Sequence, residues 1–206
     1  IQGGAGTSTN MNANEVIANR ALEHLGLPKG SYDTLHPNDQ VNASQSTNDA
    51  YPTALKLATW FGIQDLLAAL AGLRGAFEAK AREFNAILKI GRTQLQDAVP
   101  MTLGQEFTAF DSMVANDEKR RRESAYLMTE VNLGGTAIGT GINAPVGYVA
   151  LVIPKLAELS GVPVTAAADM IAATCDTGAF DDISGILKRI ASKLSKISND
   201  LRLLSS

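Results

Sequence analysis

The sequence has few of the side chains that form covalent links or hold metals. Cys175 is its single cysteine, which cannot pair within the chain and is typical of a protein from a reducing cytoplasm. A lone cysteine in a helical pattern is more often a small core residue than a nucleophile, so we expect Cys175 to be packed in the core. The two histidines, His24 and His36, are far apart in the sequence, and neither lies close to Cys175. The sequence therefore predicts no metal site and no cofactor.

Positive charge and long apolar runs are also scarce. The formal net charge is −3 and the pI is about 5.4, which argues against nucleic acid or an anionic membrane as the main partner. No uninterrupted apolar run is long enough to span a bilayer, and we expect no secretory leader. Aromatic residues make up only 5% of the chain, so we expect a core of Ala, Leu and Ile.

Two glycine-rich stretches lack the residues of nucleotide-binding loops. They are Gly4-Ala5-Gly6-Thr7 and the segment 134–141. A Walker loop requires a Lys followed by Ser or Thr after its second glycine, and a dinucleotide fingerprint requires a preceding strand and a third glycine. Because neither requirement is met, the sequence excludes both kinds of nucleotide site.

Helical periodicity dominates the chain. Apolar residues recur at spacings of three and four, and no segment alternates convincingly with period two, so strands should be few. We expect helices over 11–26, 148–160 and 167–174, and three longer helices with apolar seams. The seams are Ile63, Leu66, Leu70, Leu73 and Phe77 in a helix that begins near 52; Leu103, Phe107, Phe110 and Val114 over about 102–131; and Ile183, Ile186, Ile190, Leu194, Ile197, Leu201 and Leu204 in the last helix. The mixed charge run 117–123 favours a solvated helix face over a nucleic-acid patch. The predicted fold class is all-α, a long-helix bundle.

Three hydroxyl- and amide-rich stretches lie beside these helical patterns. Ser44–Asp49 precedes a long helix, and its residue types are those that cap helix starts and favour an anion there. On its own this stretch would be read as a cap. The segments 3–10 and 91–97 have the same small, neutral, donor-rich character. Three such stretches together predict one polar site.

Neutral donors suit one particular chemistry. They can hold a carboxylate, and can stabilise one that gains charge when a proton is removed from the adjacent carbon. Candidate donors in these stretches are Thr7, Ser46, Thr47, Asn48 and Thr93. None of the motifs offers a convincing base.

The motifs together resemble those of the aspartase/fumarase superfamily. The matching stretches, in the order expected for that family, are Gly4–Val16, His36–Asp39, Gln45–Asp49, Gly91–Ala98 and Gly139–Asn143. The resemblance covers essentially the whole chain. It implies the long-helix bundle of that superfamily, a small dicarboxylate substrate, and a homotetramer whose active sites each draw residues from three subunits.

Within the superfamily the sequence resembles the aspartate ammonia-lyases most closely. Gln94 stands where class II fumarases usually have His, Thr47 follows Ser46 as in aspartases, and the ending 199–206 is aspartase-like. Against this, His36, Asn38 and Asp39 resemble the second anion site of fumarases, although Gln40 departs from the His most common there. The predicted reaction is reversible elimination of ammonia from L-aspartate to give fumarate. Class II fumarate hydratase is the alternative.

The resemblance also implies a role for each candidate site residue. Thr7, Ser46 and Thr93 would hold a substrate carboxylate, Asn48 would support its orientation, and Thr47 and Gln94 would lie beside them. The family's base is a Ser in a G-S-S-x-M-P-x-K-x-N-P signature, which does not occur here.

The chain begins inside a motif without Met and stops without a helix-ending signal, so we expect a fragment, inactive alone. Residues 1–50 would be the end of an N-terminal domain and 51–206 part of the central bundle. A non-catalytic helical assembly fragment is the hypothesis of another class.

Overall fold

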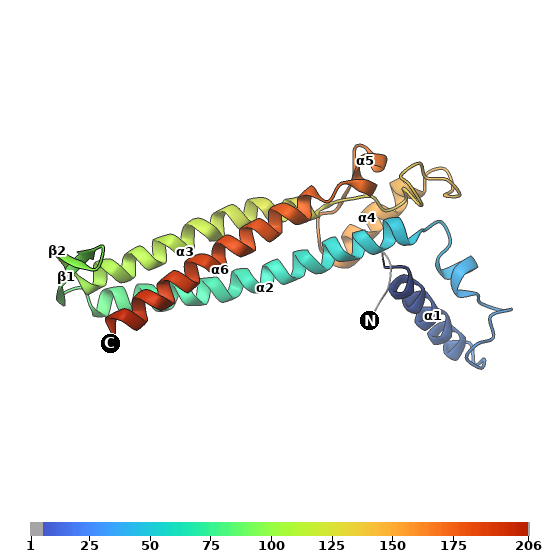
Figure 1. The fold of residues 1–206 in the computed structure, drawn as a ribbon. Coiled ribbons are helices and arrows are strands. Elements are labelled where there is room, and N and C mark those ends of the chain that lie inside the picture. Colours follow the sequence, from blue (N-terminus) through green and yellow to red (C-terminus); the bar gives the residue numbers. More distant parts are fainter. Residues whose placement is uncertain (1–5, 206) are drawn as a thin grey trace. The chain divides into compact units, whose positions relative to one another are not determined.

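The computed structural model describes residues 6–205, apart from the side chains of 117–123. The expected solvated face at 117–123 therefore lies outside the described side chains, as does the start of the first glycine-rich stretch. Contacts divide the chain into two compact units, each built from two separate segments (Figure 1). One unit comprises Ile1–Trp60 and Leu127–Thr177, and the other comprises Phe61–Tyr126 and Gly178–Ser206. The expected division into domains at residue 50 stays a prediction.

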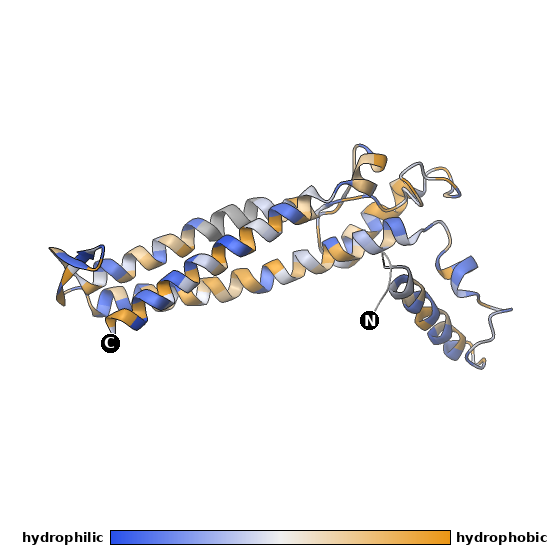
Figure 2. Cartoon of the chain, in the orientation of Figure 1, coloured by the Kyte–Doolittle hydropathy of each residue, from blue (hydrophilic) through white to orange (hydrophobic). Residues whose placement is uncertain are grey.

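The second unit is built on long helices. It contains the later part of α2 (Thr47–Glu83), a hairpin of β1 (Leu88–Thr93) and β2 (Gln96–Thr102), α3 (Leu103–Ala125) and α6 (Gly178–Leu204). Its core residues are those of the expected seams: Leu70, Phe77, Phe110, Val114, Ile190 and Ile197 are buried, with Leu66, Leu73, Phe107, Ile186 and Leu194 packed against them. The long-helix seams predicted from periodicity are confirmed. Figure 2 shows hydrophobic and hydrophilic residues interleaved along α6, as this packing requires.

The β1–β2 hairpin was not expected from the sequence pattern. β1 alternates only between exposed and partly buried residues and β2 is mostly exposed, so neither strand has a fully buried residue to mark it. Thr93 pairs with Gln96, which leaves Gln94 and Leu95 as a two-residue turn with φ of 50° and 63°. Two successive positive φ angles define the hairpin turn that normally selects Asn-Gly, so Gln-Leu gives little sequence signal for it.

The first unit holds shorter elements around the start of α2. These are α1 (Thr7–His24), the π-helical turn η1 (Pro37–Val41), the short η2 (Tyr126–Met128), β3 (Glu130–Val131), α4 (Tyr148–Ser160), β4 (Thr165–Ala166) and α5 (Met170–Cys175). Parallel pairing joins β3 to β4. A separate core of Val131, Leu133, Ile153, Val162 and Val164 packs against Leu57, Trp60 and Leu156. The bounds predicted for α4 are confirmed.

Several expected details are wrong. The first helix begins at Thr7 rather than Met11, because Gly6 takes a left-handed φ of 96° and precedes the helix without a side-chain cap. A Cβ on Gly6 would lie 2.3 Å from the Tyr51 ring, so glycine permits the close approach of α1 and α2. Cys175 is exposed at the end of α5, so the expected core position is wrong.

Helix α2 is apolar as well as long. By length and composition alone it could cross a membrane, which is weak evidence because core helices of soluble proteins pass the same test. The expectation drawn from the sequence considered only uninterrupted apolar runs, whereas α2 interleaves polar residues. Only 17% of its most apolar window is buried within this chain. Most residues of that window are therefore exposed or only partly covered within this chain.

Candidate functional site

A fully buried carboxylate organises the start of α2. Asp49 is 0% exposed. Its Oδ1 accepts a hydrogen bond from the backbone N–H of Ser46 at 2.8 Å. Its Oδ2 accepts from the N–H groups of Gly134 at 3.0 Å and Thr136 at 2.9 Å. Charge-assisted bonds of this kind are stronger than neutral ones, so Asp49 fixes the loop that follows β3 against the first turn of α2.

Amide side chains tie α1 to the same place. Asn10 Nδ2 donates to Asn42 Oδ1 and to Thr47 Oγ1, both at 3.2 Å. Asn14, which is buried, donates to the same Asn42 oxygen at 3.0 Å. These bonds connect α1, the segment after η1, and the first residue of α2 without using any charged group.

The loop after β3 is held by two further asparagines. Asn48 Nδ2 donates to the carbonyl of Ala137 at 2.7 Å. Asn132 Nδ2 donates to the carbonyl of Asn48 and to Thr174 Oγ1, both at 3.0 Å. The amide nitrogen of Asn48 is thus used within the protein. A supporting role for Asn48, rather than a direct one, fits this geometry.

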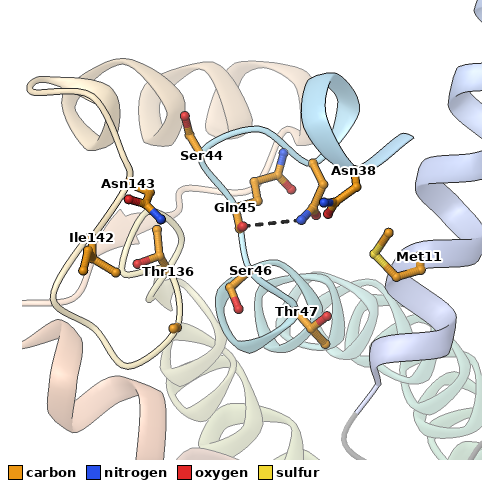
Figure 3. Close-up of a pocket in the computed structure, with 11 residues that line it drawn as sticks. Met11, Asn38, Ser44, Gln45, Ser46, Thr47, Thr136, Ile142 and Asn143 are labelled. Atoms are coloured by element: carbon orange, nitrogen blue, oxygen red, sulfur yellow. Dashed lines mark hydrogen bonds between the residues drawn. The ribbon is translucent and has the colours of Figure 1, made fainter. Parts of the chain in front are cut away.

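Between these elements lies a cavity of about 370 Å³ (Figure 3). It is lined by Met11, Asn38, Asn42, Ser44, Gln45, Ser46, Thr47, Thr136, Ala137, Ile142 and Asn143. None of these residues carries a charge. Hydroxyl and amide groups supply all of its side-chain polarity, which is the donor set expected for a carboxylate site. The cavity lies at a helix start, where unpaired N–H groups and the helix dipole favour an anion.

Tyr148, at the start of α4, is partly buried and lies within electrostatic reach of Asp49. Burial raises the pKa of the Tyr148 phenol above its ordinary value, and the negative charge of Asp49 raises it further. Both causes disfavour a second negative charge beside Asp49. Tyr148 is therefore a neutral phenol at neutral pH.

The expected site residues are distributed over both units. Ser46 and Thr47 line the cavity, whereas Thr7 is an exposed residue at the start of α1 and is not among the lining residues. Thr93 and Gln94 are exposed at the tip of the hairpin in the second unit. There they line another cavity, of about 890 Å³, together with charged residues of the hairpin and of the end of α6.

His36 has a local structural role. Its Nδ1 accepts hydrogen bonds from the N–H groups of Asn38 at 3.3 Å and Asp39 at 3.2 Å, which caps η1. Nδ1 acts as the acceptor in both of these bonds. The carboxylate of Asp39 is exposed and also accepts from Asn38 Nδ2 at 3.2 Å. Of the expected second anion site, only Asn38 reaches the cavity, and the anion site itself stays a prediction.

Sequence reasoning missed several residues that build the cavity. The Asp49 side chain was seen only as part of a helix cap, and Asn42, Thr136 and Asn143 were not singled out. A signal was present for Asp49, since S-x-x-D at a helix start predicts a local carboxylate-to-backbone bond. Its bonds to Gly134 and Thr136 span 85 and 87 residues, and no local pattern could reveal them. Within residues 6–205 as described, no group of three or more His, Cys, Asp and Glu could hold a metal ion.

Comparisons with known proteins agree with the motifs. The model of the family described as Lyase matches residues 1–206. An aspartate ammonia-lyase of Pseudomonas aeruginosa is 64% identical over 100% of this chain and 44% of its own length. A structure titled fumarate lyase:delta crystallin from Brucella melitensis bound to cobalt has a TM-score of 0.98 and 62% identity, covering 100% of this chain and 45% of that one.

A more distant solved structure has the same fold. The class II fumarase of Schistosoma mansoni has a TM-score of 0.89 at 34% identity, over 98% of this chain and 46% of that one. The chain thus spans less than half the length of the relatives it matches. On the match to the whole of its sequence, the chain belongs to the Lyase family, the aspartase/fumarase superfamily that its motifs resemble.

Proposed function

We propose that the protein is an aspartate ammonia-lyase, which reversibly eliminates ammonia from L-aspartate to give fumarate. The observation that carries this proposal is the uncharged, hydroxyl-lined cavity at the start of α2. Removing the proton next to a carboxylate creates an enolate-like dianion, and fixed neutral donors stabilise the charge that develops on it. The name of the Pseudomonas relative supports ammonia as the leaving group.

The hydroxyls of Ser46 and Thr47, at the start of α2, are both available to donate a hydrogen bond to an anion. Ser46 Oγ accepts from the N–H of Asn48 at 3.2 Å, and Thr47 Oγ1 accepts from Asn10 Nδ2 at 3.2 Å. Among the described residues neither hydroxyl donates a hydrogen bond to the protein, so each keeps its O–H for an anion. We propose that Ser46, with Thr7 and Thr93, holds the carboxylate that gains charge. Thr47, Asn48 and Gln94 would orient the substrate.

The base would come from outside these motifs. We propose that a Ser of the family signature, which these 206 residues do not contain, removes the proton, so a polypeptide of these residues alone is expected to be inactive. We also propose a homotetramer in which other subunits complete each site. Exposed apolar side chains support that assembly, among them Phe61, Leu88, Leu95 and Val99. The cysteine-poor composition supports a cytoplasmic location.

One feature favours class II fumarate hydratase as the second candidate. His36, Asn38 and Asp39 keep the residue types of the fumarase second anion site, and the Schistosoma fumarase shares the fold. If the protein is a fumarase, water replaces ammonia as the leaving group on the same carboxylate-binding residues. Metal ions and nucleic acid have no part in either proposal.

The test is a product assay on the full-length protein. It is supplied with fumarate and excess ammonium in water, and NMR identifies the product. Aspartate supports the ammonia-lyase proposal and makes Gln94 the residue to vary for amine selectivity. Malate alone refutes it in favour of hydratase activity.

Absence of both products would leave the non-catalytic helical assembly. That alternative is distinguished independently by titrating succinate, which an assembly protein has no reason to bind.

A further inference from the structure

The Thr136 side chain is buried without a partner. The residue is 4% exposed, and its Oγ1 has no hydrogen-bond partner among the described residues. A buried hydroxyl without a partner is unfavourable, and such groups are uncommon in folded proteins. A valine would fill nearly the same space without this cost. Nothing in the described part of the chain accounts for a hydroxyl at this position in place of a methyl group.

The backbone of Thr136 is also strained. Its φ is 56°, a conformation that β-branched residues rarely adopt. Nearby Gly134, Gly139 and Gly141 take positive φ angles as glycines, which do so without strain. The fully buried Asp49 holds the strained residue through the bond from the Thr136 N–H to Oδ2. Strain held in place by a dedicated contact is typical of functional sites.

Thr136 lies where a ligand would need a donor. It lines the same cavity as Ser46 and Thr47, and Figure 3 shows its side chain beside Ile142 and Asn143 on the wall formed by the loop after β3. The only other described threonine hydroxyl that is buried without a partner is that of Thr53 within α2, and Thr53 does not line the cavity. The two threonines share burial and lack of a partner, but only one of them lies at the site.

We propose that Thr136 is a further substrate-binding residue, whose hydroxyl, covered in the unliganded chain, turns about χ1 to donate a hydrogen bond to a carboxylate of the dicarboxylate bound at the start of α2. This inference rests on the proposed function and deepens it. A carboxylate has only acceptor oxygens, and a threonine hydroxyl with no other partner has its O–H to give. Asp49 is then a positioning residue, because it fixes Thr136 and Ser46 through their backbone N–H groups.

The test compares three variants of the full-length protein. Thr136→Val removes the hydroxyl and keeps the β-branched shape, Thr136→Ser keeps the hydroxyl, and Thr53→Val removes the matched buried hydroxyl outside the cavity. Calorimetry measures succinate binding, and steady-state kinetics measure kcat/KM with fumarate and ammonium. Thermal unfolding gives Tm. We expect Thr136→Val to lower kcat/KM about 100-fold, as loss of a donor to developing charge does, and to weaken succinate binding.

The expected stability separates binding from folding. Thr136→Val should keep or raise Tm, since it removes an unsatisfied buried hydroxyl, and Thr136→Ser should retain most of the succinate affinity. Thr53→Val should match the unchanged protein in binding and rate.

Three results would overturn the inference. The first is wild-type affinity and rate in Thr136→Val, and the second is a loss of activity accompanied by an equal loss of Tm. The third is an unmutated protein that binds no succinate and forms no product, which refutes the proposed function and this inference together. The first two leave the proposed function standing.

Discussion

Replacing Asp49 by asparagine tests the central contact of the site. The carboxylate accepts three backbone N–H bonds, two at Oδ2 and one at Oδ1. In Asp49→Asn, the amide oxygen can keep the two bonds at the Oδ2 position, but the amide NH2 then faces the N–H of Ser46. The bond from Ser46 is lost, the Ser46 N–H and the new NH2 are both left without an acceptor in a fully buried place, and the two remaining bonds are no longer charge-assisted. We expect a loss of about 3 kcal/mol in the free energy of unfolding.

The assay is unfolding of the full-length protein at a fixed subunit concentration, because assembly shifts apparent stability. Asp65→Asn is the matched control, since Asp65 is an exposed carboxylate on the same helix. Asp49→Ala should be more harmful than Asp49→Asn, because it removes all three acceptor contacts. Equal stability of Asp49→Asn and the unchanged protein would refute the reasoning, and so would an equal loss in Asp65→Asn.

Three further predictions follow from single residues. Thr93→Ala should lower kcat/KM by the equivalent of about 3 kcal/mol if Thr93 donates to the developing charge, and an unchanged rate in steady-state kinetics would remove it from the site. Gly6→Ala should cost about 1–3 kcal/mol in urea unfolding, because its φ is 96° and its Cβ would meet the Tyr51 ring; unchanged stability would contradict this packing. Tyr148 has a pKa raised above the ordinary 10.0, so above pH 10 the unfolded chain loses its phenol proton first and stability falls as pH rises. In alkaline unfolding series Tyr148→Phe should show a shallower fall than the unchanged protein, and parallel curves would contradict the shift.

The helical architecture could be predicted because it depends on the spacing of apolar residues along the chain. The seam residues of α2, α3 and α6 recur at three and four residues, and burial follows that pattern. The hairpin could not, since both of its strands are largely exposed and its turn carries Gln94 and Leu95 rather than Asn-Gly. Local patterns also predicted that the first helix begins at Met11, four residues after its actual start at Thr7. The start is set by contact between Gly6 and Tyr51, which is distant in sequence.

The candidate site divides in the same way. Ser46 and Thr47 could be predicted because hydroxyls at a helix start form a recognisable local motif. Asn42 and Thr136 could not, since their roles come from contacts between distant segments. The sequence shows which residue types are present in each segment, but it does not show that Asn42 meets Asn14 or that Thr136 meets Asp49. Cys175 was wrongly expected in the core, because the helical pattern around it says nothing of which elements cover its face.

The contact between Asp49 and Thr136 spans 87 residues, and the intervening chain includes the whole of Phe61–Tyr126, which belongs to the other unit. During synthesis at about 5–20 residues per second, the carboxylate of Asp49 waits about 4 to 17 seconds for its partner loop to be made. Over that interval α2 and α3 can already form, because their contacts are local, whereas the cavity cannot close. We therefore expect the cavity to form only after the loop that follows β3 has been made, and thus later than α2 and α3 themselves.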